Sequence, residues 1–345
     1  MNRCLGLRSD VRQLVFLGRN RLFNVIYCYH VYTSMLFKFI FFVFFLILTV
    51  HPLDAKRNNI KISVDYEKRE RACGSVTDRG DKILCYIKYD YSNTAVRCDQ
   101  DDNKPGVLCS GVIFRGTDSD LNRSFHSWNP SPTSVISGGV SFSYLRKDSS
   151  FNKTAYGYVT GFIFYPMLFT PVGMDSSIKV LCGFPLDAWT SGRSDKGCGE
   201  YNSLSDTRPC IEQGIETASQ WYDTYHGRSG QNTCGFTLYS SGNAVNTSKL
   251  FDAMIKSQIL LKESSFDEQN ELRLEVWSQD KADIPLEAFF YLSGSSIGLK
   301  SSQKDQEDFY SEFSLFIPII EVKFPDSIGG EAEFSFSKND QVVTY

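Results

Sequence analysis

Residues 139–145 read GVSFSYL, a stretch in which apolar and small polar side chains alternate. This period of two is the pattern of a β-strand, and it places Ser141 and Ser143 together on one face. The apolar residues on the other face are Val140, Phe142 and Tyr144. The stretch therefore predicts a strand with one core face and one serine-lined face.

Other strand-like runs lie on both sides of this stretch, separated by turn-rich segments. The runs expected to form strands are 83–91, 107–115, 158–165, 270–277, 286–292, 313–323 and 331–337. Residues 211–225 and 248–262 have helical spacing, and Asn246 to Ser248 offer a cap for the second helix. This mixture predicts an α+β fold with a mainly antiparallel sheet. The chain has no βαβ rhythm and no glycine-rich nucleotide motif, which argues against Rossmann and P-loop enzymes.

The first 55 residues have the character of an export signal. The run MLFKFIFFVFFLILTV begins at Met35, and HPLDA follows it and ends on the small residue Ala55. This order is typical of a secretory signal peptide over 35–55, and the apolar run is short for a spanning helix of ~20 residues. An uncleaved membrane anchor is the alternative. Residues 1–34 are expected to be an upstream over-translation.

Composition and charge fit an exported globular protein. The 345 residues are 42% hydrophobic and 22% charged, with a formal net charge of −4. Cleavage after Ala55 removes six basic and two acidic residues, which leaves 30 basic against 38 acidic. The resulting acidic chain argues against nucleic acid or an anionic membrane as a partner. We expect a secreted protein, periplasmic or extracellular, with no stable membrane insertion after cleavage.

Eight cysteines follow the leader, and no two of them form a C-x-x-C pair. They are Cys73, Cys85, Cys98, Cys109, Cys182, Cys198, Cys210 and Cys234. An even number of cysteines in an exported chain that is poor in histidine favours four disulfides over a zinc site. The pairing is left open because many connectivities are compatible with the spacing. Residues 56–106 are expected to form a disulfide-rich N-terminal segment, and no metal site is expected.

Three strand-borne polar elements follow one another along the chain. Arg115 ends the apolar run VIFR, where a guanidinium needs a partner such as a carboxylate or a phosphate. Ser141 and Ser143 form the serine face. In QNELRLEVW, Gln269 and Glu271 point to one face and the leucines to the other. Taken singly, each element has an ordinary explanation as a strand-end salt bridge, a solvated edge or outward-facing strand residues.

In this order, the elements resemble the arginine–serine–glutamate class of mono-ADP-ribosyltransferases, the cholera-toxin and pertussis-toxin type. That class has an arginine on an early strand, as in FRGTD, and then a serine motif, which VSFSYL resembles with Phe142 replacing a threonine. A Q-x-E or E-x-E strand follows, with an I-P step into an aromatic strand, here Ile284-Pro285 and AFFYL. The stretch CSGVIFRGTD also resembles secreted halovibrin-type proteins of Gram-negative bacteria. The resemblance covers 107–293 and leaves 294–345 as a β-rich extension.

The resemblance implies a split antiparallel sheet, NAD as the substrate and a protein as the target. Cleavage of the nicotinamide–ribose bond passes through an oxocarbenium-like state, which a neighbouring carboxylate stabilises. By the resemblance, Glu271 has this role, Arg115 binds phosphate or ribose oxygens, and Ser141 orients Glu271. Gln269 contacts the acceptor side chain, and Ser143 lines the NAD site. Because Gln269 is neutral, we expect an acceptor other than arginine.

The match departs from the class between the second and third elements. The gap from Ser143 to Gln269 is long, and residues 166–246 are expected to be a disulfide-tied insertion. Two acidic pairs compete with Glu271 for the carboxylate role, although neither leads into an I-P step. The competing residues are Glu331 with Glu333, and Glu212 with Glu216.

Trp128 lies beside His126, between the arginine and the serine elements. A loop that reaches the site would let Trp128 bind nicotinamide or adenine; alternatively, the indole anchors the loop in the core. Two other functions are open at this stage. One is an NAD glycohydrolase that uses water as the acceptor, and the other is a secreted disulfide-rich adhesin or binding module without catalysis.

Overall fold

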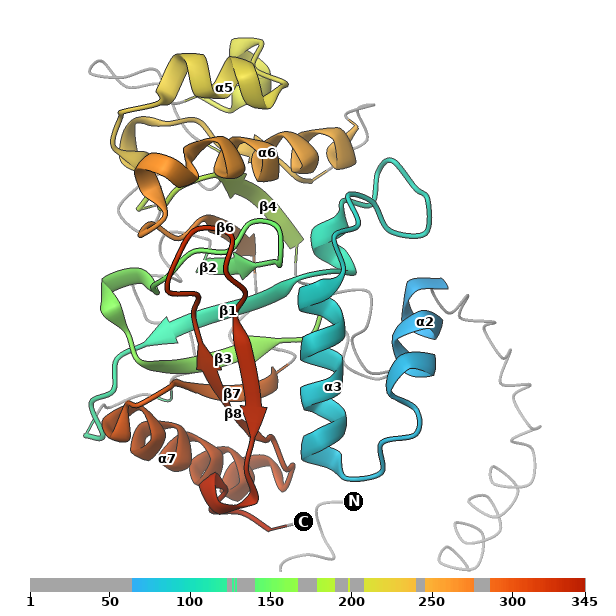
Figure 1. The fold of residues 1–345 in the computed structure, drawn as a ribbon, viewed down its shortest axis with the longest axis vertical. Helices are drawn as coiled ribbons and strands as arrows, with labels where there is room; N and C mark the ends of the chain where they lie inside the picture. The colour runs from blue at the N-terminus through green and yellow to red at the C-terminus, as the bar shows by residue number, and fades with distance from the viewer. Residues whose placement is uncertain are drawn as a thin grey trace, which may run out of the picture. The chain divides into compact units, whose positions relative to one another are not determined.

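Nine strands of the described residues form one sheet in the order β5-β4-β6-β2-β1-β3-β7-β8-β9 (Figure 1). The computed structural model describes residues 64–122, 126, 128, 140–166, 179–189, 198, 208–239, 246–275 and 286–344, and the expected leader lies outside them. The strands are β1 Val112–Thr117, β2 Val140–Leu145, β3 Thr160–Phe164, β4 Lys179–Phe184, β5 Phe236–Thr237, β6 Glu271–Glu275, β7 Leu286–Leu292, β8 Ile319–Lys323 and β9 Glu333–Phe336. The α-helices are α2 Val64–Cys73, α3 Arg79–Ser92, α5 Ala218–Tyr225, α6 Thr247–Ser265 and α7 Ser296–Phe313.

The sheet is antiparallel at every pairing except one. β7 and β8 run parallel, and the helix α7 connects them, because parallel neighbours require a crossover. The expected α+β fold with a mainly antiparallel sheet is confirmed. The three strands that carry the predicted site elements, β6, β2 and β1, are consecutive in the sheet.

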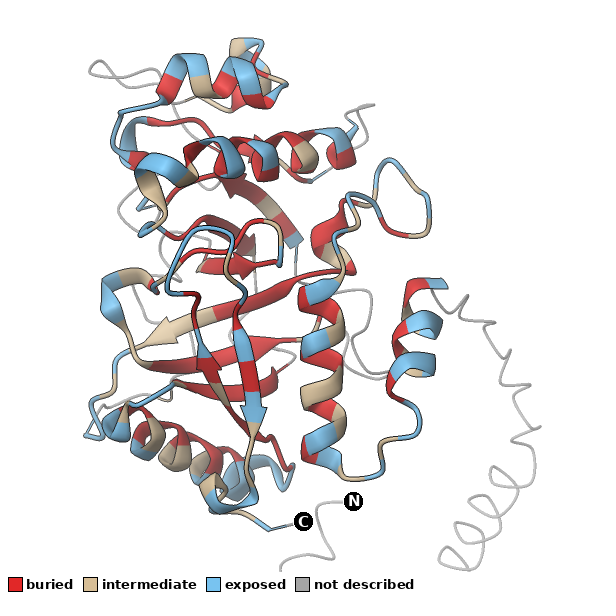
Figure 2. Ribbon diagram, in the orientation of Figure 1, coloured by how far each residue is buried: buried red, intermediate tan, exposed pale blue. Residues whose placement is uncertain are grey.

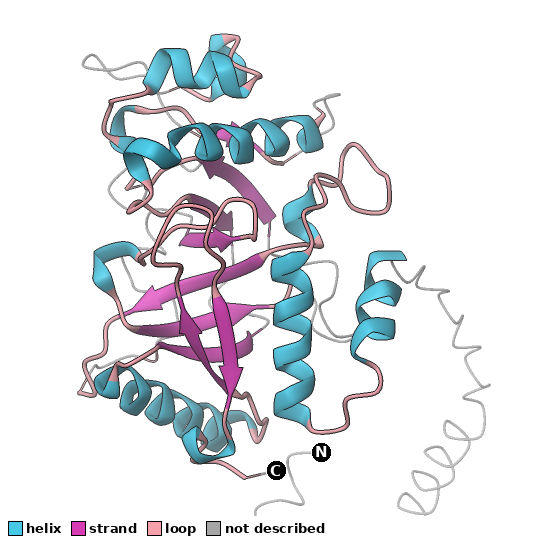
Figure 3. Cartoon of the chain, viewed as in Figure 1, coloured by secondary structure: helices cyan, strands magenta, loops and turns pink. Residues whose placement is uncertain are grey.

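Helices cover both faces of the sheet (Figure 3). α6 packs on β4 and β5, and α7 packs on β3, β7 and β8; both helices join one buried cluster that includes Phe142 and Leu272. α3 contacts β1 and β9 and belongs to a second cluster that includes Phe114 and Phe334. The central strands are therefore buried on both faces along most of their length (Figure 2). No helix in the described part of the chain is long and apolar enough to cross a bilayer.

The strand expected at 83–91 is wrong, because these residues lie in α3. The buried residues Ile83, Ile87 and Tyr91 recur every four positions, which is helical spacing. Asp78 begins the helix by accepting two backbone N–H groups of its first turn with its side chain. The β-branched and aromatic content of this run concealed the helical period.

Two predicted boundaries also change. The segment 166–246 is more than an insertion, because its residues Lys179–Phe184 form β4, which pairs with β6 inside the sheet. The C-terminal extension 294–345 is not wholly β-rich, because α7 occupies its first third before β8 and β9. In contrast, the strands expected at 139–145 and 286–292 and the helix expected at 248–262 are confirmed.

Four disulfides use all eight cysteines that follow the leader, as predicted. The pairs are Cys73–Cys85, Cys98–Cys109, Cys182–Cys198 and Cys210–Cys234. Each bridge joins cysteines that are adjacent in the order of cysteines along the chain. Asp65 lies near the sulfurs of Cys98 and Cys109, but a disulfide removes the thiolates that a metal ion needs.

We expect intact mass to show no free thiol after residue 55, and a reducing agent to lower the melting temperature. A disulfide typically contributes about 2–4 kcal/mol, largely by restricting the unfolded chain. Thermal unfolding with and without the reductant measures the change. Two or more free thiols in the native protein would contradict the four-bridge arrangement.

A buried charged triad joins the N-terminal helices to the sheet. Arg69 of α2 forms ion pairs with Asp90 of α3, at 2.7 Å, and with Glu287 of β7, and the three side chains are at most 2% exposed. The single positive charge of Arg69 faces the carboxyl groups of Asp90 and Glu287 in a site without water contact. Simultaneous ionisation of the two carboxyl groups is therefore unfavourable. Burial raises the pKa of Glu287 to about 7 against the opposing effect of Arg69, and burial also raises that of Asp90.

This triad predicts that stability falls as the pH rises from about 4.5 to 7. In this window the folded protein holds a proton on Glu287 that the unfolded chain has released, so the free energy of unfolding decreases with pH, by up to ~3 kcal/mol. Urea unfolding across this range measures the slope. Glu287→Gln fixes the neutral form and should flatten the slope, whereas Glu67→Gln, on the exposed side of α2, should leave it unchanged. Equal slopes in the wild type and Glu287→Gln would contradict the triad's role.

Candidate functional site

The sheet order brings together polar elements that are far apart in sequence. β2 lies between β1 and β6, so that Ser141 pairs with Arg273 of β6 and Ser143 pairs with Phe114 of β1. Register and alternation put Ser141, Ser143 and Glu271 on the same face of the sheet. The predicted serine face is therefore confirmed, and it continues onto the glutamate-bearing strand.

Arg115 reaches this group from the opposite face of β1. Its partner across the sheet is Phe162, and its guanidinium carbon lies 5.7 Å from the Phe142 ring centroid. Nη1 donates a hydrogen bond of 2.8 Å to the backbone oxygen of Ser141, at the point where the register between β1 and β2 ends. Gly161 of β3 permits the close approach of β3 to β1, because a Cβ there would lie 1.9 Å from the Arg115 carbonyl oxygen.

The charge of Arg115 is incompletely balanced. Burial lowers its pKa, and nearby Tyr158 and Glu271 act in the opposite direction. Among the described carboxylates, none forms an ion pair with this guanidinium, so the salt-bridge explanation of Arg115 gains no support. A partly exposed arginine that is held by a backbone carbonyl retains N–H donors suited to a phosphate.

Glu271 is buried at the start of β6. Its residue is 2% exposed, and its Oε2 accepts the backbone N–H of Ala188 at 2.9 Å. Ala188 belongs to the segment that follows β4, and Phe184 at the end of β4 pairs with Glu271 across the sheet. The carboxylate is therefore fixed in place by β4 and by the turn after it.

Gln269 is also turned inward, against the expectation that it is ready to contact an acceptor. It is 8% exposed, and its Oε1 accepts hydrogen bonds from Ser143 Oγ and from the backbone N–H of Ala155, the latter at 2.9 Å. Ser143 is 4% exposed, so it supports Gln269 and presents little surface for NAD. In this structure, Gln269 and Ser143 act as positioning residues.

Sequence analysis missed Asn270, which is the residue that locks the third element onto the second. Asn270 is fully buried, and its Oδ1 accepts the N–H of Tyr144 at 2.8 Å. Its Nδ2 donates to the Tyr144 carbonyl at 2.7 Å and to Gln258 Oε1 of α6 at 2.9 Å. The side chain thus replaces a strand partner for β2 just where β6 begins. An asparagine directly before a strand is a common turn residue, so its sequence context gave no signal of this role.

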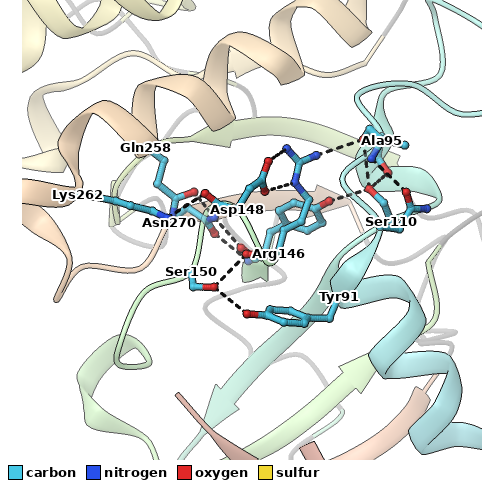
Figure 4. A network of polar contacts seen from close by, with 12 residues as sticks. Tyr91, Ala95, Ser110, Arg146, Asp148, Ser150, Gln258, Lys262 and Asn270 are labelled. Atoms are coloured by element: carbon cyan, nitrogen blue, oxygen red, sulfur yellow. Dashed lines mark hydrogen bonds and ion pairs between the residues drawn. The ribbon is translucent and has the colours of Figure 1, made fainter. Parts of the chain in front are cut away.

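These bonds belong to a larger polar network beneath α6 (Figure 4). Arg146 makes a two-point contact with Asp148, at 2.6 and 2.7 Å, and donates to the Ala95 carbonyl at 3.2 Å. Lys262 of α6 donates to the Asp148 carbonyl at 2.9 Å. The network ties the end of β2 to α6 and to the turn after α3.

Trp128 does not join this group. It is 4% exposed and packs against Phe289 of β7 and Phe309 of α7, with His126 stacked on it at 4.4 Å. The alternative reading, an indole that anchors the loop in the core, is the one the structure supports. Trp128 is therefore removed from the set of predicted NAD-binding residues.

The competing acidic pairs lie on the surface. Glu331 forms an exposed ion pair with Lys147, Glu333 with Lys323, and Glu216 with Lys249. Glu212 is exposed in a 3-10 turn. Such pairs contribute little energy and are ordinary solvated contacts. Of the five glutamates considered from sequence, only Glu271 is buried beside the serine strand.

The comparisons with known proteins identify no relative. The chain matches no model of a protein family, and no curated protein is detectably similar to it. Assignment of a function therefore depends on the site residues themselves.

Asn270→Ala should lower the free energy of unfolding by about 2–4 kcal/mol. The substitution removes three hydrogen bonds and leaves the Tyr144 backbone groups buried without this partner. Chemical denaturation measures the change. Asn246→Ala, which removes a helix cap of α6, is a comparison expected to cost about 1 kcal/mol. An Asn270→Ala loss no larger than that of Asn246→Ala would contradict the locking role.

Proposed function

We propose that this chain is a secreted mono-ADP-ribosyltransferase that cleaves the nicotinamide–ribose bond of NAD and transfers ADP-ribose to a protein. The observation that carries the proposal is that Arg115, Ser141 and Glu271 lie on the consecutive strands β1, β2 and β6, with the Arg115 guanidinium hydrogen-bonded to the Ser141 backbone from the opposite face. Nothing in their sequence separation required these strands to be neighbours. The eight paired cysteines support export, since disulfides persist in oxidising compartments.

Each residue has a role suited to this chemistry. The Arg115 guanidinium, without an ion-paired carboxylate among the described residues, binds the NAD diphosphate. The Glu271 carboxylate stabilises the positive charge that develops on the ribose as nicotinamide leaves. Ser141 holds Arg115 through its backbone oxygen, a role that differs from the expected one of orienting Glu271. Ser143 and Gln269 form the hydrogen-bonded support beside it.

The proposal requires a movement at Glu271. The carboxylate is 2% exposed and accepts the Ala188 amide, so contact with the ribose requires this amide to be displaced. A hydrogen bond from a ribose hydroxyl would take the place of the bond from the Ala188 amide. NAD binding and displacement of the Ala188 amide are thus coupled.

The deciding experiment incubates the purified protein with NAD labelled on its adenosine, with and without cell lysate. Label on a protein supports the transferase, and release of nicotinamide without protein labelling supports a glycohydrolase. Folded protein that gives neither result supports a non-catalytic binding module. The first outcome is expected.

Glu271→Gln should reduce NAD turnover by at least about 10²–10³-fold while the melting temperature changes little. Glutamine keeps the hydrogen bond to the Ala188 amide and removes only the charge that offsets the oxocarbenium state. Nicotinamide release measures turnover. The matched control is Glu275→Gln on the same strand, where the carboxylate is 38% exposed and pairs with Lys179; its activity should equal that of the wild type. Wild-type turnover in Glu271→Gln would remove β6 from the site.

A further inference from the structure

Two exposed aromatic side chains lie beside the candidate site on separate turns. Tyr156, in the 3-10 turn Ala155–Gly157 between β2 and β3, is 68% exposed, and Trp189, after β4, is 51% exposed. Their ring centroids are 6.0 Å apart. Both residues have left-handed backbones, with φ of 54° and 52°, which bulky residues seldom adopt. Such conformations persist only where the surrounding structure enforces them.

Gln269, two residues before β6, and Glu271, the first residue of β6, provide that enforcement. Gln269 Oε1 accepts the N–H of Ala155, directly before Tyr156, and Glu271 Oε2 accepts the N–H of Ala188, directly before Trp189, each at 2.9 Å. Gln269 and Glu271 thus each bind one turn through a backbone N–H group. In each turn, the aromatic residue directly follows the residue that donates this hydrogen bond. Both rings are thereby tied to the residues on which the proposed reaction depends.

The geometry of the pair does not suit a flat ring bound between the two aromatic faces. A sandwiched ring needs about 7 Å, twice the contact distance of 3.5–4.0 Å. The rings of Tyr156 and Trp189 are closer than this, are inclined at 50° and contact each other. Half or more of each side chain is exposed, as is typical of aromatic anchors that a protein partner covers.

Charges of both signs lie near the pair. Asp187 Oδ1 accepts the backbone N–H of Trp189 at 2.9 Å, and Tyr158, whose ring lies 5.6 Å from that of Tyr156, has Asp118 nearby. Burial, followed by the charge of Asp118, raises the pKa of Tyr158, whereas Arg115, which is also near Tyr156, acts in the opposite direction. Tryptophan and tyrosine faces attract ammonium and guanidinium groups. A basic surface would complement both the rings and the two carboxylates.

We propose that Tyr156 and Trp189 are the contact through which the enzyme selects its target protein, and that they bind a lysine- or arginine-bearing segment of it. This inference rests on the proposed transferase function and adds the chemistry of the partner. The cation on the rings is distinct from the acceptor side chain, which meets the ribose at Glu271. Hydrolysis of NAD, in which water is the acceptor, does not require this contact.

The test compares protein labelling with nicotinamide release in the same samples. The variant Tyr156→Asn/Trp189→Asn removes both rings, and asparagine tolerates the left-handed backbone. We expect the ratio of lysate labelling to nicotinamide release to fall about tenfold or more. Tyr156→Phe/Trp189→Phe should restore labelling, and Tyr310→Ala, an exposed aromatic on α7, should have no effect. Poly-L-lysine should inhibit labelling by the wild type, and poly-L-glutamate should not.

Several results would overturn this inference without touching the proposed function. Labelling that survives in the asparagine variant shows that the rings do not select the target. A matching fall in nicotinamide release with a raised KM shows that they bind NAD. Inhibition by poly-L-glutamate in place of poly-L-lysine shows that the partner is acidic. A folded wild type that releases no nicotinamide removes the proposed function, and this inference with it.

Discussion

The pairing of β2 with β6 determines where the serines, Gln269 and Glu271 lie relative to one another. Ser141 faces Arg273 in this pairing, and the Asn270 side chain extends it by bonding both backbone groups of Tyr144, 126 positions away. A polar side chain that takes the place of a strand has no tolerance for a register shift, because a slip of one residue exchanges the two faces of a strand. The serine face, the buried glutamate and the carbonyl that holds Arg115 all depend on this one alignment.

Strong local patterns made much of the sheet predictable from sequence. The alternation in GVSFSYL and the compact apolar run at 286–292 gave β2 and β7 close to their true bounds, and the stripe of α6 was equally clear. α3 was misread because its core residues are isoleucines and tyrosines, which are typical of strands. β4 was missed because Cys182 within it, the later cysteines and the polar segments around them suggested an insertion.

The sequence indicated which residues to consider for the candidate site, but it did not indicate their hydrogen-bond partners or their burial. The order of Arg115, Ser141 and Glu271 and its resemblance to the arginine–serine–glutamate class selected the residues, yet alternation along single strands gives no information about the partner of each side chain. Gln269 is buried against the turn at Ala155, whose backbone N–H it accepts, and Ser143 is buried beside it. This contact joins segments that are distant in the sequence, so the pattern of either segment alone does not predict it. Trp128 shows the same limit, since only tertiary packing against α7 distinguishes an anchor from a ligand-binding residue.

The four disulfides span 12, 11, 16 and 24 residues, and each closes before the next cysteine pair along the chain begins. Among the eight cysteines that follow residue 55, every correct partner is therefore the adjacent cysteine in the order in which the chain is made. Oxidation can therefore proceed in step with emergence of the chain, with no wrong bridge to be undone. β6 emerges after the last cysteine, so all four bridges can close before β2 and β6 pair.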